Sequence, residues 1–147
     1  MRKPRPAARL LIVDEKDRVL LFRFDAEDKP TFWATPGGAC DPGESYAEAA
    51  RREMWEETGF QLNPGPEVAK RTAVFTTIED EDVESDERYF LIRVPVGPID
   101  TSGHTELERR VMTVHRWWQL DELRASDEII FPNDIADMIV KLSQEAE

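Results

Sequence analysis

The sequence has little cysteine and no long apolar run. Cys40 is the single cysteine among 147 residues, so no intrachain disulfide can form, and we expect a reducing, cytoplasmic location. No apolar run approaches the ~20 residues that a membrane-spanning helix needs. The run Leu10–Val13, which follows a basic N-terminus, is too short for a signal peptide and predicts a strand. We therefore expect no membrane partner.

Basic side chains are outnumbered by acidic ones. The chain carries 19 Lys and Arg against 31 Asp and Glu, for a net charge of −12. Because nucleic-acid binding depends on a positive surface, we expect no nucleic-acid partner. A small phosphate-bearing ligand remains compatible with this charge if a bound divalent cation reverses the local field. The length and the 40% apolar content predict one domain over residues 1–147.

A helix is predicted in the first half of the chain. Ser45 and Glu48 form the S-x-x-E pattern of a capping box, which marks the start of a helix. Gly59 suits a left-handed C-cap, and the residues between are mostly good helix formers. The pattern predicts a helix over Tyr46–Thr58.

Three carboxylates share one face of this predicted helix. Glu53, Glu56 and Glu57 stand at positions i, i+3 and i+4, where side chains are neighbours. Mg²⁺ takes oxygen ligands and typically combines one or two carboxylates with substrate phosphates. The alternative is a solvated acidic face, which an acidic chain often has. Two glycines after Pro36, together with Glu44 and Arg52, favour the metal site.

These residues form one continuous pattern. The segment Gly38–Phe60 reads GACDPGESYAEAARREMWEETGF. It resembles the signature of the Nudix hydrolases, G-x5-E-x7-R-E-U-x-E-E-x-G-U with U a bulky apolar residue, at all nine specified positions. The resemblance implies an α+β fold, the Nudix-type α/β/α sandwich with a mixed β-sheet, the loop-helix-loop of the signature and a C-terminal helix. It also implies Mg²⁺ as cofactor, for which Mn²⁺ can substitute.

The resemblance assigns metal ligands. Glu53 and Glu57 would be the main ligands and Glu56 a frequent third. The backbone carbonyl of Gly37 would complete the set. Gly38, like Gly37, would let the backbone approach the metal without a side chain in the way. The alternative for the two glycines is an ordinary tight turn.

Supporting and proton-transfer roles follow from the same resemblance. Arg52 would orient Glu53 through charge-assisted hydrogen bonds, and Glu44 would hold Arg52. One carboxylate must accept a proton from the attacking water. In this chain that base would be Glu53, or else Glu106 or Glu108 in the expected loop 97–110. The alternative for the last two is a solvated loop charge.

Substrate contacts are less well marked. Asn133 follows a Phe-Pro pair, which weakly resembles the MutT-type segment that contacts a guanine base, although Asn133 is more simply the N-cap of the last helix. The arginines on the predicted strands could meet phosphate oxygens or form surface ion pairs: Arg23, Arg71, Arg88 and Arg93. The aromatic candidates for base stacking, each of which could instead belong to the core, are Trp33, Phe75, Tyr89 and Trp117.

The remaining elements follow from apolar periodicity and turn residues. We expect a mobile acidic hairpin tip over Glu79–Glu87, a loop over Gly97–Thr105 and a helical turn at Asp121–Ala125. Asn133–Gln144 is expected to close the chain as a helix. The expected strands are Ala8–Val13, Arg18–Phe24, Phe32–Thr35, Glu67–Ile78, Arg88–Val96 and Val111–Trp118.

The expected function is hydrolysis of a nucleoside diphosphate linked to another moiety, by metal-activated attack of water on phosphorus. One alternative is a MutT-like sanitiser of the (d)NTP and 8-oxo-dGTP pool. Another is a non-catalytic Nudix-fold ligand sensor. The expected partner is a small nucleotide-type substrate, with a homodimer also compatible. Markers of several Nudix subfamilies are missing from the sequence, so the subfamily stays open.

Overall fold

The computed structural model describes residues 2–26, 29–112 and 114–145. By its internal contacts the chain divides into two compact units. The first unit comprises Met1–Leu10, Gly37–Leu91 and Ile99–Gly103, and the second comprises Leu11–Pro36, Ile92–Pro98 and His104–Glu147. Strands β1 (Lys3–Asp14) and β6 (Asp82–Val94) each begin in the first unit and end in the second. The single domain over residues 1–147 stays a prediction.

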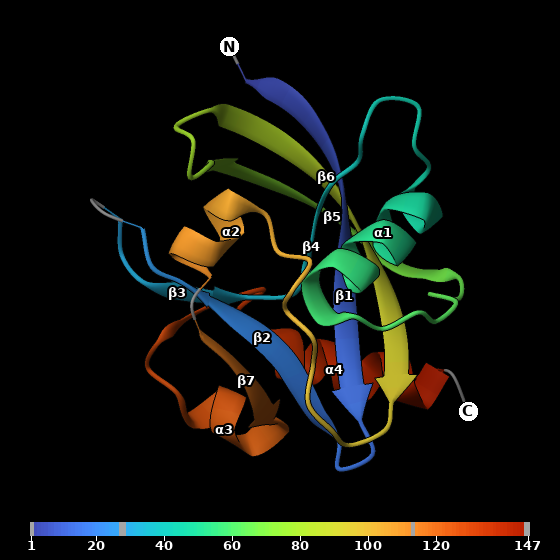
Figure 1. Cartoon of the computed structure of the whole chain (residues 1–147). Coiled ribbons are helices and arrows are strands. Elements are labelled where there is room, and N and C mark those ends of the chain that lie inside the picture. The colour runs from blue at the N-terminus through green and yellow to red at the C-terminus, as the bar shows by residue number, and fades with distance from the viewer. Residues whose placement is uncertain (1, 27–28, 113, 146–147) are drawn as a thin grey trace. The chain divides into compact units, whose positions relative to one another are not determined.

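The first unit combines antiparallel strands with one long helix (Figure 1). β5 (Glu67–Thr76) pairs with β6 in a long hairpin, from Glu67 opposite Phe90 to Thr76 opposite Asp82. β4 (Gly37–Ala39) pairs antiparallel with β1, so that Gly37 lies opposite Arg9. The pairing of β4 with β1 places Gly37 and Gly38 on a strand rather than in a free turn.

Helix α1 (Tyr46–Thr58) has the bounds that its capping signals predict. The Ser45 side chain accepts the Glu48 N–H, and the Glu48 side chain accepts the Ser45 N–H, so the capping box is complete. Gly59 closes the helix at φ 79°, in the left-handed conformation. Ala49, Ala50 and Met54 are fully buried and turn one face of α1 into the core.

The second unit is built around β2 (Arg18–Phe24). β2 pairs antiparallel with the end of β1, with β3 (Phe32–Ala34) and with β7 (Val114–Gln119). β3 also pairs parallel with β8 (Ile129–Phe131), which makes the sheet mixed. The helices are α2 (Glu106–Val111), α3 (Leu120–Ala125) and α4 (Ile135–Glu145). Among the described residues, no helix combines the length and apolar character that a membrane crossing requires.

The core of the second unit is aromatic and aliphatic. Trp33 and Trp118 meet edge to face with centroids 5.1 Å apart, and both are nearly fully buried. Four apolar residues of α4 are buried: Ile135, Met138, Ile139 and Leu142. Trp117, the neighbour of Trp118 on β7, is half-buried, as the alternation of a strand requires.

The β1–β2 turn depends on a buried carboxylate. Asp14 is 1% exposed, and its Oδ1 accepts the N–H groups of Lys16 and Arg18 at 2.9 and 3.0 Å. Its Oδ2 accepts the Arg18 side chain at 2.9 Å. Burial acts to raise the pKa of Asp14, but these donors and the Arg18 charge outweigh it, and the pKa lies below its usual range. The ionised carboxylate therefore stabilises the turn.

Several predicted boundaries are wrong. β6 begins at Asp82, so the predicted acidic tip Glu79–Glu87 is mostly strand, and the turn is confined to residues 77–81. Glu106 and Glu108 lie on a helix, α2, and not in a loop. β7 begins at Val114 rather than Val111, and position 113 of that expected strand lies outside the described residues.

The prediction that Asn133 caps the last helix is also wrong. α4 begins at Ile135, and its first backbone hydrogen bond runs from the Met138 N–H to the carbonyl of Asp134. Asp134 therefore occupies the capping position, and Asn133 stands one residue earlier, in an exposed turn.

Candidate metal centre

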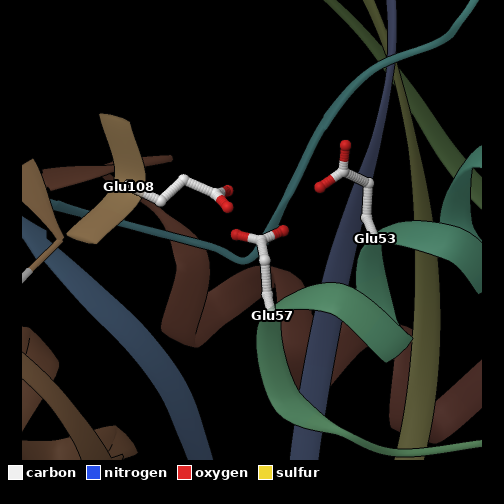
Figure 2. A group of neighbouring side chains, drawn as sticks. All are labelled: Glu53, Glu57 and Glu108. Carbon is white, nitrogen blue, oxygen red and sulfur yellow. The ribbon is translucent and has the colours of Figure 1, made fainter. Parts of the chain in front are cut away.

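Two carboxylates of α1 are buried side by side. Glu53 is 7% exposed and Glu57 is 1% exposed, and they stand one helical turn apart. Figure 2 shows both side chains projecting from the same side of the helix. Glu56, on the same face, is half-buried. Buried carboxylates are costly unless they are hydrogen-bonded, paired or bound to a metal.

The glycines of β4 make room for these carboxylates. The Gly37 N–H donates to Glu57 Oε2 at 2.8 Å. Gly37 itself has φ 124°, and a Cβ there would lie 2.1 Å from the carbonyl oxygen of Ala8, so only glycine fits. A Cβ at Gly38 would lie 2.9 Å from Glu53 Oε1. The Gly37 N–H thus reaches the Glu57 carboxylate, and the missing side chain at Gly38 leaves space for the Glu53 carboxylate.

Arg52 connects the carboxylates around it. Its Nε and Nη2 donate to the two oxygens of Glu44, each at 2.9 Å, in a bidentate pair. Its Nη1 donates to Glu53 at 2.9 Å and to Glu56 at 3.3 Å, while Nη2 also reaches the carbonyl of Ala39 at 3.1 Å. One guanidinium therefore ties the loop before α1, the end of β4 and two of the signature carboxylates together.

The network around Arg52 shifts the pKa values of the groups in it. The hydrogen bond from Arg52 is the main reason why the pKa of Glu44 lies below its usual range. The hydrogen bonds that Arg52 donates to Glu44 in turn raise the pKa of Arg52 further above its already high value. Burial, followed by the charge of Glu44, raises the pKa of the Cys40 thiol. A raised pKa disfavours the thiolate, so Cys40 is not activated as a nucleophile.

The donor set fits a divalent cation of the Mg²⁺ type. Carboxylate oxygens are hard ligands, and Glu53, Glu56 and Glu57 offer them from one rigid helix. Arg52 engages Oε1 of Glu53 and orients the carboxylate, and the Gly37 N–H does the same for Glu57. The arrangement can therefore hold a hard cation with its ligands already oriented.

The other predicted site residues lie on elements other than α1 and β4. Glu106 is exposed on α2, while Glu108, also drawn in Figure 2, is half-buried there and accepts the Thr105 N–H at 2.8 Å. Trp33 is 4% exposed, and its Nε1 donates to Glu128 at 3.1 Å. Tyr89 is 3% exposed on β6, and Phe75 is half-buried on β5. Their roles toward a substrate stay predictions.

The predicted arginines mostly form ion pairs. Arg88 bonds Asp86 and Glu67, Arg93 bonds Asp17, and Arg23 bonds Asp25. A further cationic group on β1 was missed by sequence reasoning. Arg5 and Arg9 share one face of that strand, and Arg9 pairs with the buried Glu87 of β6. The alternation Arg-x-Ala-x-Arg at residues 5–9 was the signal that could have found them.

Comparison with known proteins identifies the family. The family model of the NUDIX domain matches residues 3–137, so the chain belongs to the Nudix family. The structure is similar to the crystal structure of a MutT protein from Methanosarcina mazei Go1, with a TM-score of 0.70 over 99% of this chain and 97% of that one, at 22% identity. This likeness confirms the predicted α+β Nudix-type fold.

Two relatives are similar in sequence. Nudix hydrolase 19, chloroplastic, of Arabidopsis thaliana is 45% identical over 58 residues, 39% of this chain and 13% of that protein. The 8-oxo-dGDP phosphatase NUDT18 of Homo sapiens is 28% identical over 98 residues, 67% of this chain and 28% of that protein. The matches thus span less than a third of either relative's length.

Proposed function

We propose that the chain is a Mg²⁺-dependent pyrophosphohydrolase that cleaves the diphosphate linkage of a small nucleotide-type substrate, with Mn²⁺ able to replace Mg²⁺. One observation carries the proposal: two buried carboxylates, Glu53 and Glu57, project from the same side of α1 in a member of the Nudix family. The names of its relatives, a Nudix hydrolase and a phosphatase, support a hydrolytic reaction.

In this proposal the cation is held by Glu53, Glu56 and Glu57 and by the carbonyl of Gly37. When bound, it polarises the phosphate oxygens and neutralises charge on the leaving group. Arg52 keeps Glu53 oriented, and Glu44 keeps Arg52 in place through its bidentate pair. Gly38 leaves the space that the Glu53 carboxylate occupies.

The reaction needs one proton acceptor. As the oxygen of water bonds to phosphorus, the bridging phosphorus–oxygen bond breaks, and a carboxylate takes the proton that the water loses. Glu53 is one candidate for this base, and Glu106 and Glu108 on α2 are the others. Trp33, Phe75, Tyr89 and Asn133 remain the candidates for contacts to the nucleotide.

A second candidate is a MutT-like sanitiser of the (d)NTP and 8-oxo-dGTP pool. The similarity to an 8-oxo-dGDP phosphatase over two thirds of this chain favours action on an oxidised guanine nucleotide. Such an enzyme would release a monophosphate and pyrophosphate, and Asn133 would then be the first residue to test for contact with the base.

A product assay on the purified chain with Mg²⁺ tests both candidates. The panel holds the common (d)NTPs, 8-oxo-dGTP, ADP-ribose, nucleotide sugars, NADH and diadenosine polyphosphates. Turnover of triphosphates would support the pool sanitiser, whereas turnover of a diphosphate-linked sugar would support the broader proposal.

A variant pair ties that turnover to the carboxylates. Glu57→Gln should lose most turnover while the circular dichroism spectrum stays unchanged. Glu79→Gln, the same change at an exposed position, serves as the control. Near-normal activity of Glu57→Gln would refute the metal assignment. An absence of turnover on the whole panel, despite Mg²⁺ binding, would favour a ligand sensor.

A further inference from the structure

Arg5, on β1, has a buried donor with no acceptor. Its Nη1 atom is shielded from solvent and has no hydrogen-bond partner among the residues that the structure describes. Buried polar atoms are nearly always hydrogen-bonded, and leaving a charged group unsatisfied destabilises a protein. A guanidinium in this position therefore needs a partner that the described chain does not supply.

Glu87, the carboxylate whose charge acts most strongly on Arg5, is already engaged. Arg9 donates through Nε to Glu87 Oε2 at 3.1 Å, and its Nη2 lies 3.0 Å from the same oxygen in an ion pair. The Ser85 hydroxyl also donates to this oxygen, at 3.1 Å. Glu87 and Arg9 are both largely buried, with side chains 9% and 15% exposed. These contacts of Glu87 go to Arg9 and Ser85, and among the described residues no hydrogen bond or ion pair joins Glu87 to Arg5.

Arg5 consequently carries surplus positive charge. Burial, and then repulsion from Arg9, lower the pKa of Arg5, while the charges of Glu87 and Glu53 act in the opposite direction. Because an arginine does not lose its proton in proteins, the charge cannot be removed by deprotonation. A negatively charged ligand with a free acceptor oxygen would balance this charge and bond Nη1.

The position of Arg5 relates that anion to the metal centre. The field of Glu53 acts on its guanidinium, and the neighbouring carbonyl of Pro6 accepts the N–H of Cys40, directly after β4. The guanidinium carbon lies 5.6 Å from the centre of the Phe75 ring, a cation–π contact. Phe75 thus supports Arg5 without offering a hydrogen-bond acceptor.

We propose that Arg5 binds a phosphate oxygen of the substrate, with the Phe75 ring holding its guanidinium in place. The inference rests on the proposed function, since it requires a diphosphate ligand at the centre on α1. A phosphate oxygen supplies both missing elements, an acceptor for Nη1 and a negative charge. Arginine recognises phosphate through its planar array of donors. Arg5 is thereby a binding residue and takes no part in proton transfer.

Direct binding of a non-hydrolysable probe tests this role. Calorimetric titration with methylenediphosphonate in the presence of Mg²⁺ would compare the wild-type chain with Arg5→Gln and Arg5→Met. Loss of a charged hydrogen bond should weaken binding at least about tenfold in both variants. Arg2→Gln is the matched control, because this substitution removes the same charge at a side chain that is 58% exposed. It should stay within about twofold of the wild type.

Thermal stability separates binding from a structural role. An arginine retained for its ligand is unsatisfied in the free protein, so Arg5→Met should leave Tm unchanged or raise it. A lower Tm for Arg5→Met, or unweakened probe binding by Arg5→Gln, would overturn the inference. So would a wild-type chain that does not bind the probe. Turnover by the wild type and its loss in Glu57→Gln judge the hydrolase proposal independently of these results.

Discussion

Gly38 and Glu53 fit together so closely that a single methyl group would separate them. A Cβ at position 38 would lie 2.9 Å from Oε1 of Glu53, the oxygen that also accepts the hydrogen bond from Arg52. The space is thus fixed on one side by the backbone of β4 and on the other by Arg52. A side chain at position 38 can be accommodated only if the Glu53 carboxylate moves.

Gly38→Ala should therefore impair metal binding without unfolding the chain. Displacing an oriented metal ligand costs about tenfold or more in metal affinity. Mn²⁺ titration followed by electron paramagnetic resonance would measure the change. Gly97→Ala is the control, because a Cβ there meets nothing within 4 Å. Equal Mn²⁺ affinity of both variants would show that Glu53 is not a ligand.

Arg52→Lys should lower both stability and activity. Lysine keeps the charge but cannot form the bidentate pair with Glu44 while bonding Glu53 and Glu56. We expect a loss of about 1–3 kcal/mol in the free energy of unfolding, measured by urea denaturation. Arg51→Lys changes the adjacent, exposed residue of the same helix and should be nearly neutral. Equal effects of the two changes would contradict the role given to Arg52.

Glu108→Gln should reduce kcat far more than Glu106→Gln. A general base must be held in position, and Glu108 is half-buried and accepts the Thr105 N–H, whereas Glu106 is exposed. Glutamine can still accept that N–H, so the capping box survives and α2 should remain folded. If Glu108 is the base, kcat falls by about 10²–10⁴-fold, and the acidic limb of the pH–rate profile changes. Unchanged rates in both variants would assign the base to Glu53.

Asp14 should make the protein sensitive to acid. Because its pKa is lower in the folded chain, the ionised carboxylate contributes stability above its unfolded pKa of about 3.9. That contribution is lost as the pH falls through the lower, folded pKa. At neutral pH, Asp14→Asn should cost about 1–3 kcal/mol, and the difference from wild type should shrink in strong acid.

Urea midpoints measured between neutral and acidic pH would test this dependence. Asp17→Asn in the same turn is the control, because Asp17 has φ 58°, a conformation that asparagine also tolerates, and its side chain is 78% exposed. A difference between Asp14→Asn and wild type that does not depend on pH would argue against the ionised carboxylate.

Local signals account for what the sequence predicted well. α1 was predicted to the residue because Ser45, Glu48 and Gly59 fix its two ends through contacts within a few positions. The same logic would have found α2, since Thr105 and Glu108 repeat the capping-box pattern. The signature likewise named residues that the structure brings together on α1 and β4.

Partners distant in the chain account for what was missed. β8 has three residues and gains its hydrogen bonds from β3, which no local pattern reveals. β1 begins at Lys3 rather than Ala8, because Pro4 and Pro6 obscure a strand in sequence reading. With that start overlooked, Arg5 was not placed on a strand beside the metal centre, and the buried pair of Arg9 and Glu87 was not anticipated.

The bonds of Arg52 have a consequence for how the enzyme would work. Because one side chain fastens Glu44, Glu53, Glu56 and the carbonyl of Ala39, the loop before α1 and the helix are ordered together when the chain folds. The conformational entropy of these groups is lost during folding, so it is not lost again at each encounter with a ligand. The centre is in this sense preorganised, so a metal ion and a substrate that bound there would meet groups that are already ordered.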